Sequence, residues 1–223
     1  MSLRPLLLMV TAACATAGNS QHQGTSDAPP GTSDGPHNNS DGPAPHNDAA
    51  PIIDSPPGSC ATPFMGALAT WSFTGEPGSQ ASTAATSMAT GVNAGAVSRA
   101  AALTVASGVG SINSSNWPSA AQRDLTKYYT FSVTPPSGCQ MDLTGVSIDA
   151  LSSGTGPSMA LIATSSDAYA QTATVSTTAA STPALTVSGA TGAIEVRVYG
   201  FSASSTGGTM RLRNTLTLQG KLR

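Results

Sequence analysis

The 223-residue sequence has few charges, few aromatic residues and no long apolar run. Charged residues make up 9% of the chain, against about 25% in an average protein. The net charge is −2, so the chain lacks the basic surface that binds nucleic-acid phosphates. No apolar stretch approaches the ~20 residues of a membrane-spanning helix. These deficits argue against a nucleic-acid-binding protein and against a helical membrane protein.

Histidine is missing from residues 61–223, because the three histidines all occur earlier, at 22, 37 and 46. Without an imidazole, this part of the chain cannot form the usual Ser-His or Cys-His catalytic pairs. Glu195 and Asp149 are conceivable as the carboxylate pair of a glycosidase. However, Arg197 follows Glu195 by two positions, and a strand would place both on one face, which favours a surface ion pair. We therefore predict that the protein is not an enzyme.

Metal-binding patterns are equally weak. No Cys and His cluster has zinc-site spacing, and Asp142, Asp149 and Asp167 lack the spacing of an EF-hand. The sequence predicts no metal site and no cofactor, although it leaves a structural calcium ion open. The histidines and aspartates before residue 60 also lack a fold that would bring them together.

Residues 1–17 have the features of a secretory signal peptide. Arg4 precedes a short apolar stretch, and small residues follow it. Two processing sites compete, namely Ala15-Thr16-Ala17 for ordinary cleavage and Val10–Cys14, which resembles a bacterial lipobox with Thr11 where leucine is usual. In the second case Cys14 is lipidated and anchors the protein in a membrane. We predict an exported protein, either a bacterial outer-membrane or cell-surface lipoprotein or a plainly secreted protein.

Residues 18–60 form a Pro/Gly/Ser/Asp-rich segment with a degenerate seven-residue repeat. Each repeat has aspartate at its fourth place, at positions 27, 34, 41 and 48. The repeat lacks the apolar positions of a coiled coil, and it holds too little apolar surface to offset the entropy of folding. We predict a disordered tether ahead of a domain at 61–223.

Short segments with period-two alternation dominate residues 61–223 and predict an all-β domain. In the clearest segment Ile194, Val196 and Val198 alternate with polar residues and Tyr199. Similar alternation occurs at 129–133, 141–148, 159–163 and 210–218. Such half-buried strands, separated by turns and without a helical period, are typical of an antiparallel two-sheet sandwich. The Ala-rich segment Gln80–Ala89 fits a loop or short strand better than a helix.

Several pieces occur in a familiar order: Leu68–Phe73, Ser114–Trp117, Tyr129–Val133, Gly156–Leu161, Ser165–Tyr169, Val196–Phe201 and Gly207–Leu212. Over roughly 67–220 this order resembles a domain of secreted bacterial proteins, many of which carry PEP-CTERM sorting signals. The resemblance implies a jelly-roll β-sandwich related in shape to carbohydrate-binding modules. It departs from the family at Arg213, where an acidic residue is common, and at Ser152-Ser153, where basic residues are common. The family's molecular role is largely unassigned, so the resemblance indicates a fold rather than a function.

Cysteine counting indicates a disulfide. If Cys14 is lipidated or removed, Cys60 and Cys139 remain as an even pair in an oxidising compartment. We predict a bond between them, with two free thiols as the alternative.

The best functional hypothesis from the sequence is an extracellular binding module, with a glycan as the candidate ligand. Aromatic planes beside hydrogen-bond donors suit sugar rings. The candidate residues are Arg197, Tyr199, Arg211 and Arg213 on one sheet face, with Trp117 or Tyr128 as an aromatic platform. The alternative is a structural or adhesion-type surface protein without a specific ligand, and a polysaccharide-acting enzyme is more distant.

Overall fold

The computed structural model describes residues 60–223. The predicted signal peptide (1–17), the predicted lipidation site Cys14 and the predicted tether up to residue 59 lie outside the described residues. Cys60, assigned above to the end of the tether, lies within them.

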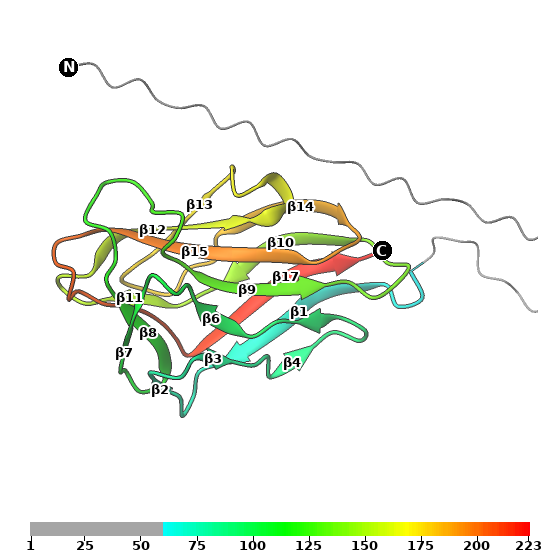
Figure 1. The fold of residues 1–223 in the computed structure, drawn as a ribbon. Coiled ribbons are helices and arrows are strands. Elements are labelled where there is room, and N and C mark those ends of the chain that lie inside the picture. Colours follow the sequence, from blue (N-terminus) through cyan, green and yellow to red (C-terminus); the bar gives the residue numbers. More distant parts are fainter. Residues whose placement is uncertain (1–59) are drawn as a thin grey trace, which may run out of the picture. The chain divides into compact units, whose positions relative to one another are not determined.

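Three β-sheets make up the described part of the chain (Figure 1). Sheet A has the order β14 (Ala184–Ala190), β10 (Met141–Ser147), β17 (Thr215–Leu222), β1 (Phe64–Ser72) and β4 (Ser87–Met88). Sheet B has the order β11 (Ala150–Ser152), β16 (Met210–Arg213), β8 (Ser111–Ser115) and β2 (Pro77–Gly78), with β7 (Thr104–Ala106) also paired to β8. Sheet C has the order β13 (Ala173–Val175), β12 (Pro157–Thr164), β15 (Ile194–Ala203), β9 (Tyr129–Thr134), β6 (Val97–Arg99) and β3 (Ser82–Thr83), with β5 (Asn93–Ala94) also paired to β9.

The chain passes between sheets A and B at two places. β10 leads directly into β11, and β16 leads into β17 through Asn214, whose φ of 58° bends the strand. The alternation of Met210, Leu212, Leu216 and Leu218 predicts one continuous strand. The structure divides it at Asn214 because asparagine tolerates the left-handed conformation that the bend requires.

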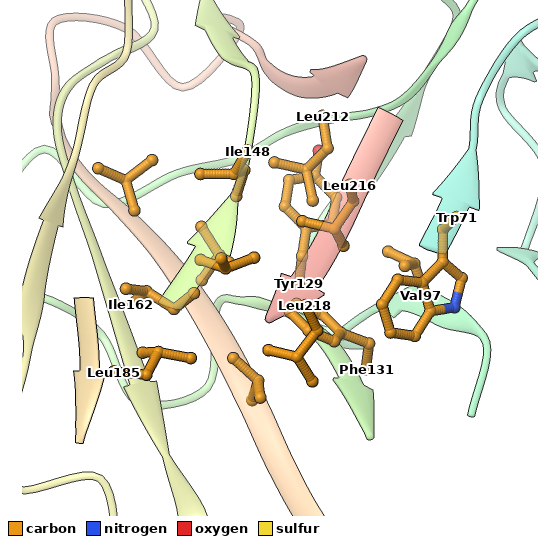
Figure 2. Packing of buried hydrophobic residues seen from close by; sticks show 14 of the residues in the cluster. Trp71, Val97, Tyr129, Phe131, Ile148, Ile162, Leu185, Leu212, Leu216 and Leu218 are labelled. Atoms are coloured by element: carbon orange, nitrogen blue, oxygen red, sulfur yellow. The ribbon is translucent and has the colours of Figure 1, made fainter. Parts of the chain in front are cut away.

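The predicted alternation places one face of each sheet in a common core. Aliphatic and aromatic side chains from all three sheets form a single buried cluster, part of which Figure 2 shows. Trp71 of β1 packs against Phe131 of β9 with ring centroids 5.0 Å apart, so sheets A and C face each other directly. The hydroxyl of Tyr129 donates a hydrogen bond to the carbonyl of Met210, which joins sheet C to sheet B.

The prediction of an all-β domain is confirmed, and the arrangement is sandwich-like. Except for β2 beside β8, the paired strands are antiparallel. Gln80–Ala89 forms the very short strands β3 and β4 with loops between them, as expected for a segment that is not helical. In residues 60–223 the remaining regular element is a 3-10 turn, η1 (Ser165–Asp167), which follows β12.

The disulfide prediction is also confirmed: Cys60 is bonded to Cys139. The bond joins the residues just before β1 to the turn just before β10, and their Cα atoms lie 4.3 Å apart. Register pairs Phe64 with Leu222 and Leu222 with Met141, so these neighbouring strand ends meet beside the bond. Cys60 therefore belongs to the folded domain rather than to the preceding segment.

Candidate functional site

The outer face of sheet C carries tyrosine and arginine side chains that contact one another. On β15, Val196 and Val198 point into the core, and Arg197, Tyr199 and Phe201 alternate with them on the other face. Register brings Leu161 of β12 beside Tyr199. The polar side of the sheet predicted by alternation is thus partly aromatic and aliphatic.

Arg197 lies between two tyrosine rings. Its guanidinium carbon is 4.1 Å from the ring centroid of Tyr128, which immediately precedes β9, and 4.1 Å from that of Tyr169, which follows η1. A cation over an aromatic face is attracted by the ring quadrupole. Three of the chain's four tyrosines, Tyr128, Tyr169 and Tyr199, gather on this face.

The backbone that holds Tyr169 in place is unusual. Ala168 and Tyr169 both have positive φ values, 56° and 64°, in a region that L-residues with side chains rarely adopt. A hydrogen bond of 2.9 Å from the Tyr169 amide to the Thr164 carbonyl secures the turn. Strained backbone of this kind tends to occur at binding and catalytic sites.

Arg123, on the loop before β9, contacts two of these tyrosines. Its Nη2 donates to the Tyr169 carbonyl at 2.7 Å, and its guanidinium lies 5.1 Å from the ring centroid of Tyr199. Tyr199 also meets Tyr128 edge to face, with centroids 5.7 Å apart. We call this set the tyrosine–arginine cluster; its members are Arg123, Tyr128, Tyr169, Glu195, Arg197 and Tyr199.

An ion pair between Glu195 and Arg197 neutralises the cluster's central cation. Burial acts to raise the pKa of Glu195, but the hydrogen bond and charge of Arg197 outweigh burial and leave this pKa below its ordinary value. Burial acts to lower the pKa of Arg197, but the hydrogen bonds with Glu195 and Tyr199 and the Glu195 charge together outweigh burial and leave this pKa above its ordinary value. Burial and the Glu195 charge raise the pKa of Tyr169. Both members of the ion pair therefore stay charged, as the sequence predicted.

A groove of about 480 Å³ adjoins the cluster and shares Arg123 with it. Leu161 and Phe201 contribute apolar surface, Leu125 stands 59% exposed on the loop before β9, and Thr172 adds a hydroxyl. Arg123 Nη1 is buried without a hydrogen-bond partner. We call this the sheet C groove. It offers apolar contact surface beside an arginine that has an unused donor.

The structure brings together only part of the predicted ligand-binding set. Arg197, Tyr199 and Tyr128 share the outer side of sheet C. Tyr199, however, is fully buried beneath its neighbours and cannot offer a ring face to a ligand. Tyr169 and Arg123 were not predicted, because they lie on irregular loops that carry no periodic signal.

The prediction that Trp117 offers an aromatic platform to a ligand is wrong. Trp117 is 1% exposed, its Nε1 donates to the Ser114 carbonyl at 2.9 Å, and its ring packs edge-on against Tyr129 at 5.4 Å. The indole is a core residue and forms no aromatic platform. Its burial follows from the loop after β8, which turns inward at Asn116, where φ is 65°.

Arg211 and Arg213 also differ from expectation, because β16 belongs to sheet B rather than to sheet C. Arg213 pairs with Asp149 at 3.0 Å, and Asn214 Nδ2 donates to the same carboxylate at 2.6 Å. Glu195 and Asp149, the conceivable glycosidase pair, are thus held by different arginines on different sheets.

Within residues 60–223 no three His, Cys, Asp or Glu side chains come together as a metal site would require. The same residues include no helix of the length and apolarity that crossing a bilayer demands. A comparison of the chain with family models, with curated proteins and with solved structures returned no match. The resemblance to the domain of secreted bacterial proteins therefore stays a prediction.

Proposed function

We propose that the protein is a carbohydrate-binding module whose ligand occupies the sheet C groove. The observation that carries the proposal is the groove's floor of Leu161 and Phe201, bordered by the tyrosine–arginine cluster. The C–H face of a sugar ring packs on apolar side chains, and its hydroxyls accept hydrogen bonds from arginine. Arg123 Nη1, buried without a partner, is the donor for such a bond.

Arg123 is the cluster residue that lines the groove, and the cluster fixes its position. Its Nη2 donates to the Tyr169 carbonyl at 2.7 Å and its guanidinium lies 5.1 Å from the Tyr199 ring centroid, so little side-chain entropy is lost when a ligand binds. The two carboxylates considered for catalysis are each paired with an arginine, which supports binding rather than hydrolysis.

We also infer that the sandwich is a jelly roll. Taken in chain order, β1, β9, β10, β12, β13, β14, β15 and β17 form one eight-strand set. In sheet A the order is β1, β17, β10 and β14, which are the first, eighth, third and sixth strands of the set. In sheet C the order is β9, β15, β12 and β13, which are the second, seventh, fourth and fifth. This is the strand order of two interlocked Greek keys.

We further propose export and, through Cys14, attachment to a bacterial surface membrane. Support comes from the leader-like residues 1–17 and from the Cys60–Cys139 bond, since disulfides persist mainly in oxidising compartments. An envelope protein would meet extracellular polysaccharides directly.

A structural surface protein is the second candidate. The outer face of sheet A favours it, because that face carries exposed or half-buried Thr and Ser side chains such as Thr70 and Thr217. Such a surface keeps a protein soluble without recognising a specific ligand.

A glycan panel tests the proposal with the full chain and two groove variants. Leu125→Asp places a charge on an exposed groove residue, and Arg123→Gln removes the unused donor. Met65→Asp, at an 83% exposed position of β1, is the matched control. We expect binding of at least one neutral glycan, weakened about tenfold or more in both groove variants and unchanged in the control. Absence of any glycan binding, or binding indifferent to both groove changes, would favour the structural role.

A further inference from the structure

A second groove lies on the outer face of sheet B and shares no lining residue with the sheet C groove or the tyrosine–arginine cluster. Register places Leu151 of β11, Arg211 of β16 and Asn113 of β8 side by side across three neighbouring strands. Ser107, Ser152, Ser153 and Thr209 complete the lining of a volume of about 310 Å³. We call this the Arg211 groove; its lining is mostly hydroxyl-bearing.

Asn113 is the first sign of a missing ligand. Its side chain is buried, with the residue only 4% exposed. Nδ2 donates to the Ser107 carbonyl at 2.6 Å, which fixes the amide's orientation, and Oδ1 has no hydrogen-bond partner. A buried acceptor without a donor costs free energy. A ligand hydroxyl entering the groove would supply that donor.

Arg211 is the second residue that indicates a missing ligand. Arg197, Arg213 and Arg223 each form an ion pair with a carboxylate, but no acidic side chain of residues 60–223 pairs with Arg211. Asp149 forms its ion pair with Arg213, two positions further along the same strand, rather than with Arg211. The Arg211 guanidinium can therefore make a two-pronged contact with an anionic group in the groove.

A second arginine, Arg99, adds positive charge next to Asn113. Arg99 donates from Nη2 to the backbone carbonyl of Asn113 at 3.2 Å, and its other donors bond to Gln80, Gly78 and Ser114. No carboxylate pairs with Arg99 within the described residues. Arg99 does not line the groove, but its positive charge lies next to the Asn113 backbone and has no carboxylate partner there, so the local potential favours an anionic ligand over a neutral one.

We propose that the Arg211 groove binds an acidic saccharide, a uronic acid residue with a carboxylate next to ring hydroxyls. The carboxylate contacts Arg211, one ring hydroxyl donates to Asn113 Oδ1, and Ser107, Ser153 and Thr209 meet the remaining hydroxyls. A simple anion satisfies Arg211 alone, because it has no donor for Asn113 Oδ1. This inference goes beyond the proposed function and uses no residue of the sheet C groove.

Calorimetric titration of the full chain with trigalacturonate, and with its fully methyl-esterified form, tests the inference. The ester keeps the hydroxyls and loses the charge, so we expect it to bind at least about tenfold more weakly. Arg211→Gln lowers affinity for the acid by a similar factor, and Arg211→Lys lowers it less. Lys221→Gln, which removes an exposed positive charge from β17, leaves affinity unchanged.

Thermal unfolding of each variant distinguishes lost binding from lost structure. Equal binding of acid and ester, equal losses in Arg211→Gln and Lys221→Gln, or no binding of trigalacturonate would overturn the inference. Leu125→Asp separates the two proposals: trigalacturonate binding that survives this change supports a separate site at Arg211. Binding abolished by Leu125→Asp but indifferent to Arg211→Gln places the acid in the sheet C groove and overturns this inference alone.

Discussion

The outer faces of sheets A and C differ, although both sheets bury their inner faces in one core. Sheet A presents short polar side chains, for example Thr70 beside Thr217, whose hydroxyl oxygens lie 3.5 Å apart. Sheet C presents tyrosines, arginines, Leu161 and Phe201 beneath two loops. An antiparallel sheet facing water requires only polar residues on its outer side. Folding explains part of the aromatic face of sheet C, because Tyr199 and Phe201 are buried. Ligand binding is the explanation that we propose for the exposed rim of the sheet C groove, where Leu125 is 59% exposed.

The two sheets are also held in different ways. Sheet A has a disulfide at the start of β1 and β10 and an ion pair between Asp142 and Arg223 at the end of β17. Sheet C has non-covalent stacking of Arg197 between tyrosines. This contrast predicts that changes at sheet A act mostly on stability and that outer-face changes at sheet C act mostly on binding.

Removing the disulfide should have a large effect on stability, of the same order as truncating a core side chain. The bond closes a loop with a sequence separation of 79, which corresponds to roughly 4.5 kcal/mol in the chain-entropy model. We expect Cys60→Ser with Cys139→Ser to lower the free energy of unfolding by about 2–5 kcal/mol in urea titrations. Wild-type protein unfolded with a reductant present should behave like the double variant. If the two differ by several kcal/mol, substitution rather than loss of the bond is responsible.

Phe131→Ala tests the inner face that both sheets share. The ring is buried against Trp71, so truncation leaves a cavity and should cost about 3–5 kcal/mol. Phe64→Ala, at a 38% exposed position of β1, is the matched control and should cost less than about 1 kcal/mol. Urea unfolding measures both. Similar losses in the two variants would contradict the placement of Phe131 in the core.

Much of this core could be predicted from the sequence, because burial repeats with the strand's period of two. Phe131, Val133, Val196 and Val198 lie on the inner faces that alternation predicts. Pairing partners and the division at Asn214 could not be predicted, since they depend on contacts distant in sequence and on one residue's φ. The disulfide was predictable because only two cysteines remained to pair.

The candidate site was less predictable for the same reason. Arg197 and Tyr199 were found through their strand alternation, but Arg123 and Tyr169 reach the cluster from loops. Trp117 was assigned to the surface because a loop tryptophan without periodic neighbours gives no sign of its burial. Arg211 was assigned to the wrong face, since the sequence does not show that β16 and β15 belong to different sheets.

Arg197→Gln tests the outer face of sheet C and should have a smaller effect on stability. It removes an ion pair and two contacts with tyrosine rings, together about 1–2 kcal/mol. Arg211→Gln, a half-buried arginine without an ion pair, should change stability by less than about 0.5 kcal/mol. Thermal unfolding compares the two. Equal effects would show that the stacking contributes nothing to the fold.

The smallest effect is expected at the Asp142–Arg223 pair, and it depends on pH. Hydrogen bonds from Arg223 and from the Gly189 amide lower the pKa of Asp142 from 3.8 to about 2. Because the folded-state pKa lies below the unfolded value, the stabilisation is fully present above about pH 4. It is lost as the pH falls from about 4 to about 2.

Asp142→Asn should therefore lower the melting temperature slightly at pH 7 and abolish part of the decline between pH 4 and pH 2. Melting temperatures of both proteins at each pH provide the measurement, and the two curves should converge at the acid end. Thr144→Ala, an exposed change two positions further along β10, should leave the wild-type pH profile intact. A constant offset between Asp142→Asn and wild type from pH 7 to pH 2 would contradict the lowered pKa. The contrast between sheets A and C would then rest on the disulfide rather than on the Asp142–Arg223 ion pair.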